Sequence, residues 1–538
     1  MADLTFEQSG LRQSGRLRHE ANIIGLLFAS TTSIVGSGWL FGSFHAARIA
    51  GPLAVWSWVA GAVIIMLIAL CFAELAVLFP RSGALVHMSH ASHGESLGRI
   101  WGWMLFLSYV PIAPVEAEAV ITYANNYFPH FLQPGSAGLL NPFGFAACAF
   151  LIGVFCVVNL LAVGLLLRIN TSITWWKLAI PALTGIALIV ASTRWGVMKA
   201  DPGSYRFSDI FVALPSAGIV FSYLGFRTAI DLGGESSNPS RHIPLAVIGS
   251  VALCAILYIL LQFGFLLGLR PGDVAHGWSH LNFAGSSGPF AGLAAGLGMT
   301  WLAVLLYIDA YVSPGGTGLI YVTGSARVLF ALGETDAGPS WLTALTSVNR
   351  SPWAAILLTW VIGILFLLPF PAWQLLVGYI TSITVLTYGL GPIALLVLRK
   401  NLPEAPRRFR LWGARVIAPI AFICSNLVIY WTGFRTNTYL FGIVFLGLIF
   451  YALHFHFVAR RPAADFGWRN ISWLFPWFCG MWLLSGISNV GHGAGWIGFW
   501  TGVFLVVVWS LIVVAIAERT ALIPRETLEI MAKMDARA

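Results

Sequence analysis

The chain has 538 residues, of which 58% are hydrophobic and only 9% are charged. Soluble domains have about 25% charged residues, so this composition excludes an ordinary soluble protein. The formal net charge of +9 raises the question of a nucleic-acid partner, but the distribution of the charges, described below, indicates a membrane orientation instead.

Apolar stretches long enough to cross a bilayer recur along nearly the whole chain. A spanning helix needs roughly 20 predominantly apolar residues. The predicted fold class is therefore an all-α polytopic membrane protein. We predict fourteen spans, at residues 21–47, 52–79, 99–128, 142–166, 170–192, 209–232, 244–268, 289–328, 352–370, 373–399, 413–433, 438–458, 471–488 and 495–517.

Basic residues fall mainly on one side of this arrangement. With the N-terminus in the cytoplasm, 22 of the 30 Lys and Arg residues lie inside, 6 lie outside, and Lys177 and Arg227 lie within spans. This bias follows the positive-inside rule. We therefore expect a multi-pass protein of the cell membrane (the bacterial inner membrane), with both termini cytoplasmic because the number of spans is even.

The first span contains Gly36-Ser37-Gly38 near its middle. Interior glycines weaken a helix, and hydrocarbon offers no hydrogen-bond partner for exposed backbone. The triplet therefore predicts a helix that stops and restarts, a feature that in transporters often marks the substrate site. Close packing of two helices through small residues is the alternative interpretation.

The sixth span has a second candidate interruption at residues 221–226, around Gly225. Residues 21–192 and 209–400 hold five predicted spans each, and each set opens with a glycine-interrupted helix. Because five is odd, the second set enters the membrane with the opposite orientation. Corresponding interruptions in two inverted halves favour a transporter with its site at the bilayer midplane.

The chain divides at its polar stretches. Loops between spans are short, and the basic, Pro-containing stretch 400–412 separates a core from accessory helices. We predict no cofactor and no metal site, since His87, His90 and His93 are spaced for a cytoplasm-facing connector helix rather than for converging ligands. The predicted segments are a cytoplasmic N-terminal segment 1–20, a first inverted repeat 21–192, a second inverted repeat 209–400, accessory spans within 413–517 and a cytoplasmic C-terminal tail 518–538.

Several motifs occur in a fixed order between residues 21 and 415. They are Gly36-Ser37-Gly38, Phe72-Ala73-Glu74-Leu75, Phe79-Pro80-Arg81-Ser82-Gly83, residues 221–226 with Glu235, Asn238, Pro239, Arg241, Ile243 and Pro244, then Ser325-Ala326-Arg327-Val328-Leu329, residues 398–403 and Arg407-Arg408-Phe409-Arg410. As an ordered set they resemble the amino acid–polyamine–organocation superfamily of permeases, most closely its bacterial aspartate–proton symporter-like members. The resemblance implies a LeuT-like core of two inverted five-helix repeats with broken first and sixth helices. The role of the last four spans is left open.

The resemblance places an amino acid substrate between the two breaks. Its carboxylate would be received by free N–H groups at the start of the half-helix after the triplet, where a helix end carries about half a positive charge. Its ammonium would be received by freed carbonyls near Ser33 and Ile34 and at residues 221–224. The predicted substrate-binding residues are Ser33, Ile34, Gly36, Ser37, Gly38, Glu116, Ser222, Tyr223, Leu224, Gly225, Phe226 and Arg227.

Three of these residues have a second interpretation. Arg227, if it faces the cavity, would select a second carboxylate, as in aspartate or glutamate, but it can equally form an internal salt bridge with Asp231 one turn later. Glu116 could hold the ammonium, carry a proton or pair internally. Phe226 could close over the substrate or belong to the apolar core.

Lys177 lies within the fifth span, where a charge costs around 2.5–3.5 kcal/mol on insertion scales. One interpretation is a side chain that snorkels to the interface beside neighbouring tryptophans. The resemblance implies a proton-coupling role instead, with the ammonium bridging carbonyls near Gly36 to Ser313 and Thr317 in the eighth span. Asp309 is a second proton candidate, with internal pairing as its alternative.

Together these features predict a secondary active transporter, not an enzyme, that imports an amino acid, expected to be acidic, with protons by alternating access. Its partners would be the small-molecule substrate, protons and the lipid bilayer, with no nucleic acid, while the oligomeric state is open. Alternatives are an exchanger, a permease for neutral amino acids or amines and, from another class, an intramembrane transferase. Glu74 is expected to gate the cytoplasmic side or to contact a basic residue such as Arg81.

Overall fold

The computed structural model describes residues 22–79, 84–136, 138–161, 163–192, 205–233, 236–334, 338–346, 351–458, 462 and 466–537. Within these ranges the chain is mainly helical, and pairing of extended backbone is limited to two isolated bridges. The predicted all-α polytopic class is confirmed.

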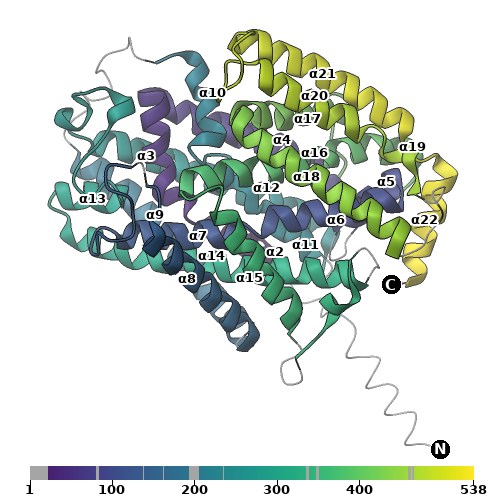
Figure 1. The fold of residues 1–538 in the computed structure, drawn as a ribbon, viewed down its shortest axis with the longest axis horizontal. Helices are drawn as coiled ribbons and strands as arrows, with labels where there is room; N and C mark the ends of the chain where they lie inside the picture. The colour runs from purple at the N-terminus through teal and green to yellow at the C-terminus, as the bar shows by residue number, and fades with distance from the viewer. Residues whose placement is uncertain are drawn as a thin grey trace, which may run out of the picture.

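The α-helices follow one another along the chain with short connections (Figure 1). They are α2 Ile23–Ile34, α3 Gly38–Ala50, α4 Ala54–Leu78, α5 Ala84–His93, α6 Glu95–Tyr109, α7 Ile112–Ala124, α8 Pro142–Leu161, α9 Val163–Ala191, α10 Phe207–Ser216, α11 Thr228–Asp231, α12 Pro239–Gly268, α13 Pro289–Gly296, α14 Thr300–Glu334, α15 Trp353–Leu367, α16 Trp373–Asn401, α17 Ala414–Thr432, α18 Phe434–Leu453, α19 Trp468–Ile471, α20 Leu474–Ile487, α21 Phe499–Thr520 and α22 Pro524–Arg537. Tighter 3₁₀ turns are η1 Gly51–Leu53, η3 Phe221–Arg227, η5 Pro271–Val274, η6 Trp278–His280 and η7 Ser340–Thr343, and η8 His454–Val458 is a π turn.

Every one of the fourteen predicted ranges contains helix. By length and composition, ten helices in the described part of the chain are able to cross a membrane, and an eleventh is obtained if α10 and the following η3–α11 count as one bent span. The helices α2 and α15 are shorter but also apolar. The number of spans and the inverted repeat stay predictions.

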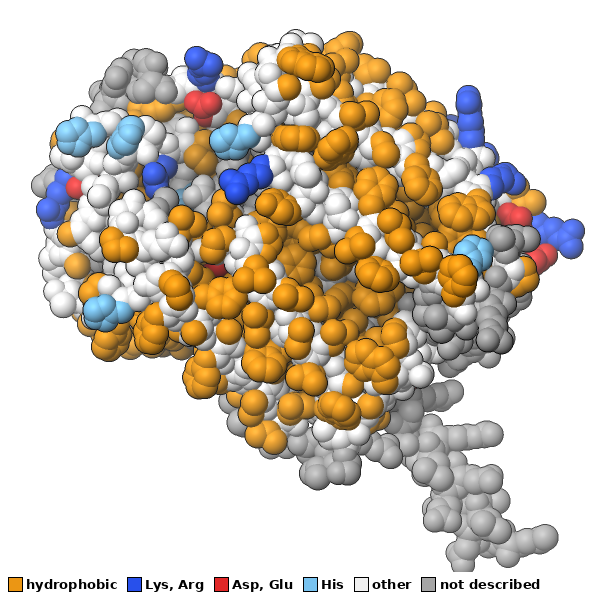
Figure 2. Space-filling model, in the orientation of Figure 1, with side chains coloured by type: hydrophobic (Ala, Val, Ile, Leu, Met, Phe, Trp, Pro, Cys, Tyr) orange, Lys and Arg blue, Asp and Glu red, His pale blue; other side chains and the backbone are white. Residues whose placement is uncertain are grey.

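The surface agrees with a position in the bilayer. Figure 2 shows hydrophobic side chains over the middle of the visible face and charged side chains mainly towards its two ends. Large exposed apolar side chains include Phe150, Val190 and Phe504. Such a surface is stable against lipid, whereas water would disfavour it.

The two ends of the long axis hold different elements. In Figure 1, α3 and α13 lie towards one end, and α5 and α22 lie side by side at the other. The predicted orientation makes the first end the outer side and the second end the cytoplasmic, inner side. The helices α7 and α16 run through the interior between them and are buried along most of their lengths.

The accessory helices pack against the core rather than standing apart from it. The helix α17 contacts both α4 and α16, and the indole of Trp477 on α20 lies against Gly389 of α16. The same indole donates to Asn426 Oδ1 at 2.8 Å, and Asn426 Nδ2 donates to Ser510 Oγ at 2.8 Å. Polar side chains buried between apolar helices are satisfied by such bonds, which fix how the helices sit together.

Candidate functional site

The first span is interrupted where the glycine triplet predicts. The helix α2 ends at Ile34, residues 35–37 are irregular, and α3 begins at Gly38. Val35 has φ −85° and ψ 86°, which are not helical angles. The predicted break in the first span is confirmed.

The second break lies earlier than predicted. The helix α10 ends at Ser216, and the axis bends by 56° before residues 221–231. Gly218 has φ +77°, the left-handed region that only glycine enters without strain, and it turns the chain here. The predicted centre at residues 221–226 was wrong, because this segment continues as the 3₁₀ turn η3 instead of opening.

Glycines allow the two breaks to touch. A Cβ atom on Gly225 would overlap the backbone of Ser33 and Ile34, and one on Gly38 would overlap Ser222. Ser30 ties the same elements together, since its Oγ donates to the Phe226 carbonyl at 3.1 Å and accepts the Ala229 N–H at 2.9 Å. These glycines therefore lie at a helix break and also allow two helical segments to pack closely. The two interpretations of the glycines, as a break and as a close contact, are compatible.

Glu116 occupies the first break. This fully buried side chain on α7 accepts the Ser37 N–H through Oε2 at 2.9 Å. A Cβ atom on Gly36 would lie 2.5 Å from Oε1, so glycine leaves the space that the carboxylate fills. Ser37 precedes the N-terminus of α3, which is a favourable position for an anion. In this state the protein's own carboxylate lies where we predicted the substrate carboxylate.

Lys177 lies on α9, next to the same break and fully buried. Its Nζ donates to the Thr32 carbonyl at 3.1 Å and to Thr317 Oγ1 on α14 at 2.6 Å. The ammonium therefore bridges the first span to α14 as predicted for Thr317. Ser313, the other predicted partner, donates to Asp309 Oδ1 at 2.7 Å instead.

Asp309 forms a second polar group one helical turn from Ser313. Besides Ser313, Trp176 donates to Asp309 Oδ1, at 2.7 Å through its indole N–H. Asp309 Oδ2 has no hydrogen-bond partner among the described residues. Trp176 and Lys177 are adjacent on α9, so one turn of this helix contacts Asp309 and Thr317 on α14 as well as the first span.

Arg227 ends η3 and is only 4% exposed. Its Nε lies 3.6 Å from Asp231 Oδ2, and its guanidinium carbon lies 4.1 Å from the ring centre of Tyr109. Tyr109 in turn donates to Asp231 Oδ2 at 2.7 Å. The internal salt bridge describes this state, while Arg227 Nη1 has no hydrogen-bond partner in the described part of the chain. Phe226 is fully buried and packs against Tyr388.

Charged residues close the inner side of the site. Glu74, at the end of α4, is fully buried and accepts two hydrogen bonds from Arg399 of α16, at 2.9 and 2.5 Å. The Leu411 N–H also donates to it at 2.7 Å, and Arg407 Nε lies 3.3 Å away. Glu74 thus pairs with basic residues as expected, whereas Arg81, the suggested partner, lies outside the described residues.

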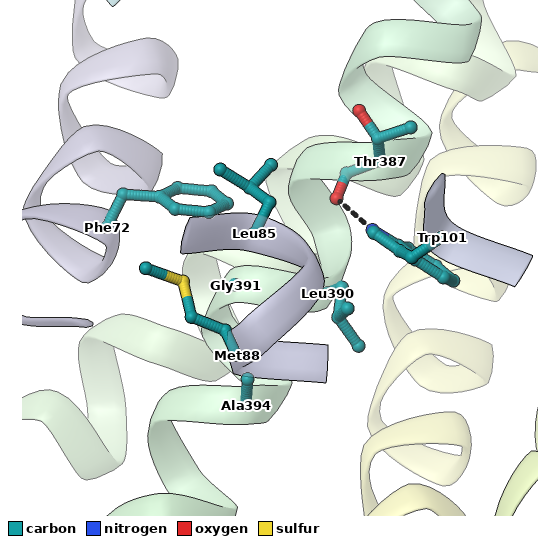
Figure 3. A pocket seen from close by; sticks show the side chains of 8 residues that line it. All are labelled: Phe72, Leu85, Met88, Trp101, Thr387, Leu390, Gly391 and Ala394. Atoms are coloured by element: carbon teal, nitrogen blue, oxygen red, sulfur yellow. Dashed lines mark hydrogen bonds between the residues drawn. The ribbon is translucent and has the colours of Figure 1, made fainter. Parts of the chain in front are cut away.

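A narrow apolar gap, with no room for a water molecule, lies beside these charged residues between α4, α5, α6 and α16. Figure 3 shows Phe72, Met88 and Trp101 around it, with the Trp101 indole donating to the Thr387 carbonyl at 3.1 Å. None of its lining residues belongs to either break. The gap is therefore separate from the candidate substrate site.

Comparison with known proteins identifies the family to which this chain belongs. A family model described as "Amino acid permease" matches residues 22–447, which is more than half of the chain. The chain belongs to the amino acid permease family. This places it in the amino acid–polyamine–organocation superfamily and makes it a transporter, not an enzyme.

Several curated relatives of the permease are bacterial transporters of similar length. It is 34% identical over 489 residues to the glutamate/serine transporter AimA of Bacillus subtilis, an alignment that covers 89% of each chain. Its identity to the aspartate-proton symporter of the same organism is 29% over 521 residues, covering 95% of the permease and 98% of the relative. The branched-chain amino acid permease BcaP of B. subtilis is 25% identical over 453 residues, covering 81% and 93%.

Two tyrosines that we did not predict complete the site of the permease. Tyr258 on α12 donates through its hydroxyl to the Ile34 carbonyl at 3.3 Å and the Ser222 carbonyl at 3.0 Å. Tyr388 on α16 donates to the Leu224 carbonyl at 2.5 Å. Carbonyls that we predicted to receive an ammonium are thus occupied by hydroxyl groups in this state. The signal in the sequence was a tyrosine within each long apolar span, the single one in α12 and the second of two in α16, where Tyr379 is the other.

The three histidines of α5 do not form a metal site in the described residues. No group of three His, Cys, Asp or Glu side chains in this part of the chain is arranged to hold a metal ion. The helix α5 connects α4 to α6 as expected, but His93 does not face the cytoplasm. It is buried, with Nδ1 at 3.0 Å from Ser92 Oγ and Nε2 at 3.2 Å from the Ala517 carbonyl of α21.

Proposed function

We propose that the permease imports an acidic amino acid together with protons by alternating access. The observation that carries the proposal is the Glu116 carboxylate bound to the Ser37 N–H at the first break, beside the buried Lys177. The names of two relatives, a glutamate/serine transporter and an aspartate-proton symporter, support the substrate class and the coupling ion.

The substrate carboxylate would replace Glu116 at Ser37. Two carboxylates cannot share one N–H group at low cost, so binding requires Glu116 to be protonated or to move away. The substrate ammonium would take carbonyls that Tyr258 and Tyr388 now occupy, at Ile34 and Leu224. Backbone groups then hold the part common to all amino acids, which leaves selectivity to side chains.

Proton coupling would use Lys177 with Glu116. A buried ammonium is stable only while its hydrogen bonds to Thr32 and Thr317 are intact. When the first span rotates away from α14, these bonds break and the lysine can release its proton. Asp309 is a second acceptor on α14, since its Oδ2 has no partner among the described residues.

The second carboxylate of an acidic substrate would bind Arg227. A guanidinium offers five N–H donors in a fork that matches a carboxylate, and Nη1 is free of hydrogen bonds to the described residues. The ion pair with Asp231 favours a second candidate, a permease for small neutral amino acids, because it leaves Arg227 already neutralised.

Uptake into proteoliposomes tests both candidates. Labelled aspartate, glutamate, serine and arginine are offered with and without an inward proton gradient. We expect gradient-driven uptake of aspartate or glutamate, loss of gradient dependence in Lys177→Ala, and loss of the preference for acidic over neutral substrates in Arg227→Gln. Preferred serine uptake that Arg227→Gln leaves unchanged would support the second candidate, and a requirement for sodium would contradict proton coupling.

A further inference from the structure

The first two residues of α16 join both breaks on the outer side of the site. Trp373 donates its indole N–H to Ser37 Oγ in the first break, at 2.9 Å. Gln374 donates its side-chain amide to the carbonyl of Ser216, the last residue of α10 before the second break, at 2.9 Å. One helix end therefore holds the ends of two interrupted spans.

The indole of Trp373 also fills the space between the breaks. It stacks on His45 of α3 with ring centres 5.6 Å apart and planes at 12°, and its ring centre lies 4.9 Å from that of Phe41. The ring of Phe221 on η3 meets it edge-on at 6.2 Å. Trp373 is only 3% exposed, so these contacts seal it into the protein. We call Trp373, Gln374, His45 and Phe41 the outer closure.

Gly218 is adapted to this indole as well as to the bend. A Cβ atom at Gly218 would lie 2.8 Å from the Cη2 atom of Trp373, which is closer than real contacts allow. The residue that turns the second break therefore also makes room for the aromatic side chain that covers the first. Trp373 and the two breaks fit together as a unit.

Ser37 connects the outer closure to the interior of the site. Its backbone N–H donates to Glu116 Oε2, and its hydroxyl oxygen accepts from Trp373. Both bonds end on one residue between the two half-helices, and its carbonyl accepts the Leu40 N–H at 3.0 Å at the start of α3. Release of the Glu116 carboxylate from the Ser37 N–H can therefore move the Ser37 hydroxyl, which is the acceptor of the Trp373 indole N–H.

We propose that Trp373 is the outer gate of the substrate site and that Ser37 links the gate to Glu116. This rests on the proposed function, because it needs a substrate that binds at the breaks from outside. With the indole off Ser37 the site is open to the outer side. A substrate carboxylate that replaces Glu116 at the Ser37 N–H restores the position of Ser37, and the indole then closes over the bound amino acid. Trp373 acts through Ser37 and is a positioning residue.

The test is a double-mutant cycle on substrate binding from the outside. Trp373→Phe keeps the ring and removes the indole N–H, and Ser37→Ala removes the acceptor but keeps the backbone N–H that Glu116 uses. A net hydrogen bond of about 1 kcal/mol corresponds to roughly a 5-fold change. We expect each variant to raise the KM for external aspartate or glutamate about 5-fold with kcat nearly unchanged. The double variant should show about the same 5-fold effect, because both changes remove the same bond.

Trp360→Phe is the matched control. This tryptophan on α15 also donates a single indole bond, to the Ala149 carbonyl at 3.1 Å, but it lies between α15 and α8, away from both breaks. It should lower stability without changing KM. Release of labelled substrate from the purified, detergent-solubilised protein provides a second measurement, with dissociation about 5-fold faster in Trp373→Phe and in Ser37→Ala.

Several results would overturn the gate. KM and dissociation rates in Trp373→Phe and Ser37→Ala equal to those of the unaltered protein would do so, as would a double variant whose effect is the product of the two, about 25-fold. If Trp360→Phe changed KM and the dissociation rate as much as Trp373→Phe, the role of Trp373 would be structural only. If the unaltered protein neither binds nor transports any amino acid, the proposed function itself fails, which is a different outcome from these.

Discussion

The outer and inner sides of the proposed substrate site are closed by different chemistry. The outer closure consists of aromatic contacts and hydrogen bonds between uncharged groups. The rings of Trp373 and His45 stack, and the Trp373 indole N–H donates one hydrogen bond to Ser37. The inner closure, which we define as Glu74, Arg399 and Arg407, is ionic and buried. Aromatic contacts of this kind are worth about 0.5–1.5 kcal/mol each, whereas separating a buried ion pair costs several kcal/mol. The comparison implies a readily opened outer side and an inner side that opens only when binding supplies the energy.

The inner closure also links parts that alternating access must separate. Glu74 lies near the end of α4, in the second predicted span, and Arg399 lies near the end of α16, in the tenth. We propose that alternating access rocks the first, second, sixth and seventh spans against the others. Opening inwards therefore pulls Glu74 away from both guanidinium groups at once.

Glu74→Ala should have the largest effect. The variant leaves Arg399 and Arg407 without their shared carboxylate, and Arg407 is only 3% exposed, so we expect the free energy of unfolding to fall by about 3 kcal/mol. Denaturation in detergent measures this change. Glu529→Ala, which removes the partner of the exposed Arg525 on α22, is the matched control and should change stability by less than about 0.5 kcal/mol. Similar effects of the two variants would contradict a specifically buried inner closure.

A second prediction concerns pH, and it again distinguishes the inner side. Burial lowers the pKa of His93 from 6.5 to about 4, while its bond to the Ala517 carbonyl acts in the opposite direction. The unfolded chain therefore binds this proton first as pH falls, so the stability contributed by neutral His93 is complete above pH 6.5 and is lost between 6.5 and about 4. At pH 5.5 we expect a loss on the order of 1 kcal/mol.

The measurement compares stability between pH 7.5 and 5.5 in the unaltered protein and in His93→Phe, which keeps a ring against Trp473. The ring centres of His93 and Trp473 lie 5.4 Å apart. We expect a shallower dependence on pH in the variant, even though its absolute stability is lower. The same slope in both proteins would show that His93 is protonated to an equal extent in the folded and unfolded states.

The C-terminal helix provides a third and smaller effect at the inner side. Asn401, at the end of α16, donates to the Leu522 carbonyl at 2.7 Å and to Thr527 Oγ1 at 2.9 Å, and Thr527 donates to the Ala91 carbonyl of α5 at 3.2 Å. The predicted tail 518–538 is thus largely the helix α22, packed on α5 and α16. Asn401→Ala should weaken this packing by about 1 kcal/mol, because it removes two buried bonds.

Amide hydrogen exchange in α22 reports this change. A weakening of about 1.4 kcal/mol is a factor of 10 in the opening equilibrium, so we expect exchange to accelerate roughly 5–10-fold. Leu528→Ser, on the exposed face of α22, is the control and should leave the exchange rate nearly unchanged. Uniform acceleration across α5, α16 and α22 would instead indicate global destabilisation.

The sequence predicted the first break better than the second, for a physical reason. Gly36-Ser37-Gly38 contains glycines on both sides of one residue, and a helix in lipid cannot easily continue through them. In the sixth span Gly218 and Gly225 compete, and composition does not say which one takes a positive φ and which one allows close approach. That choice depends on the first span, against which Gly225 packs.

The partners of buried polar groups could be predicted only in part. The resemblance to the permease superfamily led to Thr317 as a partner of Lys177, and a buried ammonium does need hydroxyl or carbonyl oxygens. Ser313 offers the same chemistry one turn away but bonds to Asp309, and only the rotation of α14 decides between them. Tyr258 and Tyr388 were missed because a tyrosine in an apolar span does not reveal which distant carbonyl its hydroxyl reaches.

The smallest predicted effect tests the outer closure and completes the comparison. His45 is 9% exposed and contributes a flat ring to the stack on Trp373. His45→Phe keeps a ring at this position, whereas His45→Leu keeps apolar volume without the stack. Because one aromatic pair is worth about 0.5–1.5 kcal/mol, we expect the leucine variant to raise the external KM by roughly 2–3-fold and the phenylalanine variant to leave it nearly unchanged. Neither variant should alter the pH dependence assigned to His93. An equal increase of KM in both variants would mean that the imidazole acts through its nitrogen atoms. The outer closure would then depend on polar contacts of His45, as the inner closure depends on Glu74, and not on the stacked rings.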